Sequence, residues 1–197
     1  MTASFRSFNL VLFVACAAIF SVALSGYPAH AQQAAGSGTY SLEEMKRAGT
    51  QYFGDTTDGL ARVVENAFDR YGLPNGYVLG QEGSGALFGG LTSGEGKLYT
   101  KNAGEHNLFW QGPSVGFDWG GQGSQVMMLV YNLSNVNDVL GRFAGVSGQA
   151  YAVAGAGMTV LQGGSVVVVP IRTGLGVRVG VNLGYLKITS NPTWNPF

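Results

Sequence analysis

The chain has 197 residues, of which 11 are basic and 11 acidic, so its formal net charge is zero. Charged residues make up only 11% of the chain, against roughly 25% in an ordinary soluble domain. This balance argues against non-specific electrostatic binding to nucleic acid or anionic lipid. The hydrophobic content of 46% is too high for a disordered chain, so the composition predicts one sparsely charged, glycine-rich globular domain.

The first 31 residues have the three parts of a secretory signal peptide. Arg6 supplies the basic region, residues 10–24 form an apolar run, and Ala29-His30-Ala31 is an A-x-A cleavage site. The run is shorter than the roughly 20 residues that span a bilayer as a helix, which leaves an uncleaved anchor as the weaker alternative. A lipoprotein would use Cys16, but the apolar run continues beyond it. We predict cleavage after Ala31 and export to the periplasm.

Cleavage would leave residues 32–197, with 10 basic and 11 acidic side chains, a net charge of −1 and no cysteine. An exported protein without cysteine cannot use disulfides, so its core must hold it together. Residues 32–40 are small and polar, and they predict a flexible leader. Residues 41–197 are predicted to form a single domain.

Two helices are expected at the start of this domain. Ser41 and Glu44 form the S-x-x-E pattern of a capping box, and Gly49 weakens the end of the helix that follows. The second helix has an apolar stripe at helical spacing and ends at Gly72. The stripe consists of Leu60, Val63, Val64, Ala67, Phe68 and Tyr71. Thr57 or Asp58 is the expected cap, and the charged opposite face is expected to lie in solvent.

Beyond residue 71 the hydrophobic period changes to two, and glycines punctuate short apolar runs. Strands are expected at residues 77–79, 86–91, 97–101, 107–111, 114–119, 125–133, 149–161, 166–172 and 174–189. Turn signals stand at Asn75-Gly76, Ser93-Gly94, Gly120-Gly121 and Gly163-Gly164, and a helical interruption capped by Ser134 is expected at residues 135–144. The pattern predicts a mainly β fold: a small soluble antiparallel β-barrel of about eight to ten strands with two or three short α-helices.

Within the last expected strand, apolar residues and glycines alternate from Gly174 to Tyr185. Glycine weakens a strand unless curvature or a close approach requires it. The sharp coiling of a small barrel is such a requirement. The alternative is that the glycines expose the backbone so that a ligand can contact it.

The sequence matches known catalytic motifs only weakly. Residues 112–116 match G-x-S-x-G around Ser114, but that motif needs a helix after the serine and a histidine later in the chain, whereas His106 precedes it. The mature chain has no metal-binding cysteine or histidine pair, no G-x-G-x-x-G and no Walker A sequence. We therefore predict a protein that is not an enzyme and has no metal and no cofactor. A serine hydrolase that uses Ser114 is one alternative.

Binding residues are predicted from clustering and from position in the strands. The tentative ligand-binding residues are Trp110, Phe117, Trp119, Arg172 and Arg178. The three aromatic side chains would cover an apolar part of a ligand, or else they are ordinary core residues. Asp118 is expected to pair with one of the arginines, either to fix the strand register or as part of a site.

The small residues of segment 150–157 favour spare volume inside the barrel, with Ala154 as a lining residue. The site is therefore expected to be apolar and insensitive to salt.

Several long strings resemble one known family. They are residues 40–44, 83–96, 110–121, 169–174 and 193–197, including WQGPSVGFDWGG and TWNPF. They are similar to the envelope integrity protein A family. The resemblance implies a periplasmic, soluble β-barrel that supports cell-envelope integrity, and it provides no catalytic or ligand residues to carry over. A weaker likeness of residues 114–158 to SYLF lipid-binding domains implies affinity for phospholipid or another apolar envelope component.

Together these observations predict a non-enzymatic periplasmic protein that supports envelope integrity by binding a lipid or cell-surface glycan component. No nucleic-acid partner and no membrane span are expected after cleavage. The other alternative is an integral outer-membrane β-barrel, since the chain ends in Phe197 and is long enough for eight strands. Pro192 and Pro196 weigh against it, because proline removes ladder donors from a final strand.

Overall fold

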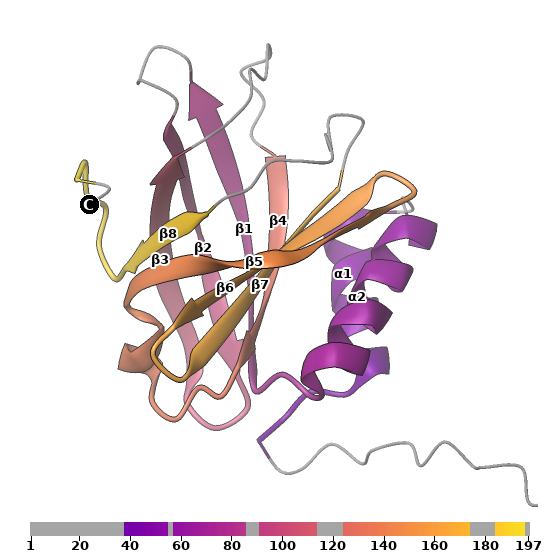
Figure 1. Cartoon of the computed structure of the whole chain (residues 1–197). Coiled ribbons are helices and arrows are strands. Elements are labelled where there is room, and N and C mark those ends of the chain that lie inside the picture. Colours follow the sequence, from indigo (N-terminus) through magenta and orange to yellow (C-terminus); the bar gives the residue numbers. More distant parts are fainter. Residues whose placement is uncertain (1–37, 55–56, 86–90, 114–123, 174–183, 196–197) are drawn as a thin grey trace, which may run out of the picture. The chain divides into compact units, whose positions relative to one another are not determined.

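The computed structural model describes residues 38–54, 57–85, 91–113, 124–173 and 184–195. The chain divides into two units after Gln32, and every described residue belongs to the second unit. Figure 1 shows a barrel with two helices against one side. In chain order the elements are α1 (Leu42–Phe53), α2 (Thr57–Tyr71), β1 (Gly76–Gly85), β2 (Leu91–Thr100), β3 (Gly104–Pro113), β4 (Ser124–Tyr131), the 3-10 helix η2 (Val136–Val139), β5 (Gly141–Val153), β6 (Ala156–Gly163), β7 (Val166–Thr173) and β8 (Tyr185–Thr189).

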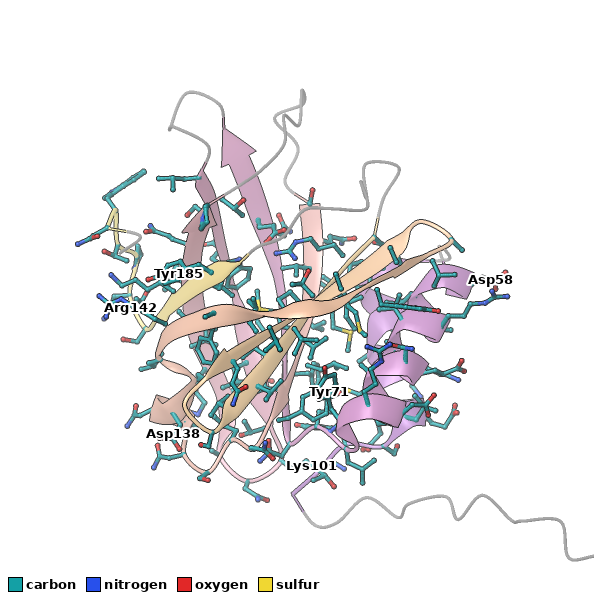
Figure 2. The ribbon with its side chains drawn as sticks, viewed as in Figure 1. Asp58, Tyr71, Lys101, Asp138, Arg142 and Tyr185 are labelled. Carbon is teal, nitrogen blue, oxygen red and sulfur yellow. The ribbon has the colours of Figure 1, made fainter. Side chains whose placement is uncertain are left out.

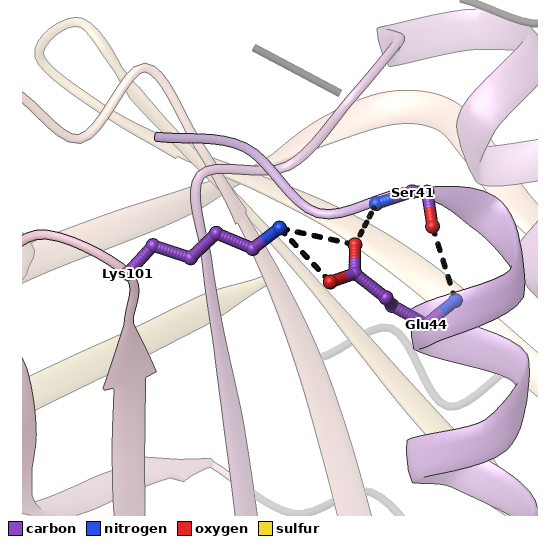
Figure 3. A network of polar contacts seen from close by, with 3 residues as sticks. All are labelled: Ser41, Glu44 and Lys101. Atoms are coloured by element: carbon purple, nitrogen blue, oxygen red, sulfur yellow. Dashed lines mark hydrogen bonds and ion pairs between the residues drawn. The ribbon is translucent and has the colours of Figure 1, made fainter. Parts of the chain in front are cut away.

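Helix α1 begins with the capping box that the sequence predicts. The Glu44 N–H donates to Ser41 Oγ at 3.2 Å, and the Ser41 N–H donates to Glu44 Oε2 at 2.7 Å. Lys101, in the turn between β2 and β3, lies 2.9 Å from Glu44 Oε1 (Figure 3). The helix runs past Gly49 and ends at Gly54, whose φ of 78° suits glycine. The cap therefore also ties the helix to the barrel.

Helix α2 buries the predicted apolar stripe. Leu60, Val63, Val64 and Ala67 are fully buried against the barrel, and the helix ends at Gly72, with φ 75°. On the charged face Asp69 and Arg70 are exposed, as expected, while Glu65 is half-buried because it pairs with Lys46 of α1 at 2.6 Å. The expected cap at Thr57 or Asp58 is wrong, because α2 already includes both residues.

The eight described strands form a closed antiparallel barrel in the order β1-β2-β3-β8-β5-β6-β7-β4, which confirms the predicted architecture. Strands β4 and β7 are nearly continuous apolar runs because both of their faces are buried. On β7, Val166 and Val168 point into the barrel, whereas Val169 and Ile171 point outward beneath the helices. The barrel interior and the helix–barrel interface are thus two separate cores.

The segment from residue 135 to 161 differs from the prediction. The helical interruption is only the 3-10 turn Val136–Val139, capped by Asn135 instead of Ser134, and Phe143 already belongs to strand β5. Burial in the barrel core overrides the helical spacing of these apolar residues. The expected single strand 149–161 is in fact interrupted by a turn at Ala154 and Gly155, with φ of 47° and 79°.

The turn signals had different outcomes. Gly163-Gly164 is confirmed as a turn between β6 and β7. The expected turn at Ser93-Gly94 is wrong, because both residues lie inside β2. Asn75-Gly76 opens β1 instead of joining two strands: the Asn75 side chain donates to the Leu133 carbonyl at 2.7 Å and accepts from the Leu133 N–H at 3.1 Å. Gly120-Gly121 lies outside the described residues.

Of the last expected strand, the described part contains only β8 and Gly184. The alternation of glycine and apolar residues over 174–183 falls outside it.

Neither of the described α-helices is long and apolar enough to cross a membrane.

Candidate functional site at one end of the barrel

One end of the barrel, called the mouth here, is where β1 and β3 end and where β2 and β4 begin. The register places Gly85 opposite Leu91, Leu91 opposite Pro113, and Glu82 opposite Ser124. Arg172, near the end of β7, is level with Val126 of β4. This is the upper end in Figure 1, where the arrowhead of β1 lies.

A buried carboxylate lies just inside the mouth. Glu82 of β1 is only 8% exposed, and three N–H groups converge on it. Arg172 of β7 donates from Nη2 at 3.0 Å and also from Nε, while Trp110 of β3 donates from Nε1 at 3.3 Å. The charge-assisted, two-pronged contact with the guanidinium is the strongest type of side-chain hydrogen bond. Glu82, Arg172 and Trp110 are called the mouth cluster below.

Glycines on two strands make room for the indole of Trp110. A Cβ atom added at Gly94, directly opposite on β2, would lie 2.6 Å from Trp110 Cζ2. One added at Gly80 of β1 would lie 2.6 Å from Trp110 Cη2. The ring therefore lies flat over bare backbone, which brings its N–H within reach of Glu82.

The arginine of the cluster is its most exposed charged member. The Arg172 side chain is 20% exposed, against 8% for Glu82. Removing either partner would leave the other charge partly buried and uncompensated. The geometry thus holds the guanidinium in place at the mouth.

A row of small residues continues from Arg172. The register places Arg172 opposite Gly157 of β6, and Gly157 opposite Ala152 of β5. Ala152 is exposed, as is Ala150, which lies two residues before it on the same face. These small side chains leave a shallow apolar surface beside the cation, called the mouth shelf below.

Two of the five residues that the sequence singled out, Trp110 and Arg172, are thus brought together through Glu82. Trp110 is only 1% exposed and belongs to the barrel core, which was the stated alternative. Phe117, Trp119 and Arg178 lie outside the described residues, as do Asp118 and Ser114. The partner of Arg172 within the described part is Glu82, which sequence reasoning missed. Its place on the inward face of β1, four residues after Val78, was the available signal.

Ala154 does not line the barrel, contrary to the prediction. It sits in the exposed turn of the β5–β6 hairpin, where its backbone carbonyl packs against Gly59 of α2. Ala156 is buried in the core beneath the helices. Within the described residues, no cluster of histidine, cysteine or carboxylate side chains could hold a metal ion.

These features define a small closed antiparallel barrel with two helices on its outer face and a buried ion pair at its mouth. Residues 38–197 match the family described as envelope integrity protein A. The chain belongs to this family, which indicates a role in the cell envelope.

A solved crystal structure of a β-barrel-like, uncharacterized protein from Brucella abortus is similar in sequence and fold. Its sequence is 62% identical, the match covers 81% of this chain and 99% of that protein, and the TM-score is 0.76. A search of curated proteins gave no match.

Proposed function

We propose that this protein is a non-enzymatic periplasmic barrel that supports cell-envelope integrity by binding a lipid or other envelope component at its mouth. Membership of the envelope integrity protein A family supports the envelope role. The signal-peptide pattern of residues 1–31 supports a periplasmic location.

The observation that carries the binding proposal is the mouth shelf. Exposed Ala150 and Ala152 offer an apolar surface next to the partly exposed guanidinium of Arg172. An amphipathic molecule could bury its apolar part against the shelf and direct a polar group to Arg172. Because Arg172 is neutralised by Glu82, apolar contact would dominate the affinity and salt would have little effect.

An integral outer-membrane barrel is disfavoured by the distribution of side chains. Such barrels have a polar interior and an apolar outer band. Here the interior contains Leu98, Leu108 and Phe143, while an outward ion pair joins Lys97 to Glu105 at 2.9 Å. A basic residue facing lipid near the midplane costs about 2–4 kcal/mol.

A hydrolase centred on Ser114 is also disfavoured. His106 lies near the start of β3, with its Nε2 2.9 Å from the Ala103 carbonyl oxygen at the opposite end of the barrel. Ser114 follows directly after the end of this strand. At ~3.4 Å per residue, the strand puts about 24 Å between His106 and Pro113.

Native mass spectrometry of the protein released from periplasm, followed by lipid extraction, tests the proposal. A bound envelope component should accompany the wild-type protein. Ala152→Phe should reduce the bound fraction, because the ring would fill the mouth shelf. Ala103→Phe is the matched control, since Ala103 is exposed in the turn at the other end of the barrel, and binding should persist. Absence of any bound component, or equal loss in both variants, would refute the proposed site.

A further inference from the structure

The guanidinium of Arg172 uses only one of its edges to bind Glu82. Nε and Nη2 donate to the two carboxylate oxygens, whereas a guanidinium carries five N–H groups in a fixed planar fork. The two N–H groups of Nη1 and the second one of Nη2 donate to no residue in the described part of the chain. Because the side chain is 20% exposed, these donors are available to a ligand at the mouth.

The other polar side chains that point inward near this end carry no charge. Thr92 of β2 is buried on the inward face, and Thr159 of β6 alternates with residues that pack outward beneath the helices. Among the described residues, Glu82 and Arg172 are therefore the charged side chains that face the inside of the mouth. Lys101, by contrast, lies at the opposite end of the barrel (Figure 2).

The ion pair is neutral as a unit, and this decides which head groups fit. An anionic head group at the guanidinium would lie close to the Glu82 carboxylate, whose repulsion cancels much of the attraction, and it would lose hydration in a partly buried site. A cationic head group would meet the guanidinium itself, because Glu82 is buried and both of its oxygens already accept hydrogen bonds. An uncharged oxygen accepts from the remaining N–H groups without either cost.

We propose that the mouth binds acyl compounds with an uncharged head group, namely acyl esters, and that Glu82 excludes free fatty acids. The ester or hydroxyl oxygen of the head group accepts from Arg172, and the acyl chain lies on the mouth shelf of Ala150 and Ala152. The inference rests on the proposed binding of an envelope component at the mouth and names its chemical class. Glu82 acts through Arg172 and is a specificity-determining residue.

Calorimetric titration of the protein, purified from periplasm and freed of bound lipid, tests the inference with three amphiphiles of equal chain length. Monolaurin is uncharged, laurate is anionic and dodecyltrimethylammonium is cationic, and each is used below the concentration at which it forms micelles. The wild-type protein should bind monolaurin about tenfold more tightly than either charged probe, because a poorly compensated ion pays at least that factor in lost hydration. Ala152→Phe should weaken monolaurin binding and Ala103→Phe should not, which places the probe at the mouth.

Glu82→Gln should shift the preference toward the anionic probe. Without the carboxylate, laurate should bind about tenfold more tightly than it binds the wild type, as expected for a hydrogen bond to a charged group, while monolaurin binding should change little. Added salt should weaken this laurate binding, because an uncompensated charge now provides the attraction. Glu95→Gln is the matched control: it removes the same charge from the exposed outer face of β2 and should keep the wild-type preference.

The double variant Glu82→Gln/Arg172→Met shows whether the guanidinium receives the head group. It leaves no unpaired charge at the mouth, so laurate should gain nothing, and monolaurin should bind less tightly than to the wild type because its hydrogen-bond donors are gone. Thermal melting checks the folding of every variant. If Glu82→Gln does not fold, the comparison of the three probes on the wild-type protein and on the double variant still decides the inference.

Wild-type binding of laurate as tight as that of monolaurin, or the same preference in Glu82→Gln as in Glu95→Gln, would overturn the inference and leave binding at the mouth intact. The same holds if none of the probes binds although native mass spectrometry finds a bound component that Ala152→Phe displaces. If no bound component is found either, the proposed binding function fails as well.

Discussion

Arg172 of β7 reaches Glu82 of β1 although strand β4 lies between them in the barrel. The two residues are 90 positions apart in the chain, and the contact depends on the length of the arginine side chain, which crosses the inner surface above Val126. The same carboxylate accepts the indole N–H of Trp110. One carboxylate thus connects three strands at the mouth, which makes it the most informative position to perturb.

Glu82→Gln should destabilise the protein by about 2–3 kcal/mol, because Arg172 would lose its counter-charge in a site that is largely buried. Breaking a fully buried pair costs about 3–5 kcal/mol, and the lower figure follows from the 20% exposure of Arg172. Urea denaturation measures the effect. Glu95→Gln, on the exposed outer face of β2, should change stability by less than about 0.5 kcal/mol.

The double variant Glu82→Gln/Arg172→Met should recover most of that loss, since no unpaired charge remains. A double variant as unstable as the sum of the two single variants would show that Glu82 and Arg172 do not act as a pair.

Gly94→Ala should destabilise the barrel by about 1–3 kcal/mol, the usual range for overpacking. The added methyl group would collide with the indole of Trp110. The surrounding core side chains prevent the indole from moving away. Gly83→Ala on β1 is the control, because a Cβ there meets nothing within 4 Å. Thermal melting compares the two variants. If Gly94→Ala is as well tolerated as Gly83→Ala, the close packing of Trp110 on β2 is wrong.

The stability contributed by Glu44 should disappear at low pH. The Ser41 backbone N–H, then Lys101, hold the pKa of the Glu44 carboxyl below its usual value of 4.5. A carboxyl group with a lowered folded-state pKa stabilises the fold above its unfolded pKa and loses that effect as pH falls through the folded value.

Glu44→Gln should therefore reduce stability at pH 7 and flatten the decline in stability below pH 4.5. Urea denaturation at a series of pH values measures both. Glu43→Gln, an exposed neighbour on the same helix, should keep the wild-type pH dependence. A Glu44→Gln profile parallel to that of the wild type would contradict the assignment.

Ala154→Gly should stabilise the protein by about 0.5–1 kcal/mol. Ala154 has a φ of 47°, in the left-handed region that costs a non-glycine residue roughly 1–2 kcal/mol. Glycine removes this strain, but its greater conformational freedom in the unfolded chain offsets part of the stabilisation. The melting temperature measures the change. Ala152→Gly, two residues earlier in strand β5, should instead lower stability, because glycine weakens a strand.

The local parts of this fold were accessible from sequence because nearest-neighbour chemistry decides them. The capping box of Ser41 and Glu44, the stripe of α2 and the Gly163-Gly164 turn depend on residues within a few positions of each other, and all were predicted correctly. The 135–144 segment failed because its apolar spacing suits a helix as well as a buried strand. Only the barrel core, which takes up Phe143, decides between them.

By itself, the sequence determined the composition of the barrel, its predicted export signal and its membership of the envelope integrity protein A family. Only the tertiary structure decided which charges meet. It joined Arg172 to Glu82, and it placed Arg142 opposite Lys187, in a chain whose composition had suggested no basic cluster. The physical reason is that the strand register couples residues 45 to 90 positions apart, and closing the barrel around its apolar core fixes that register.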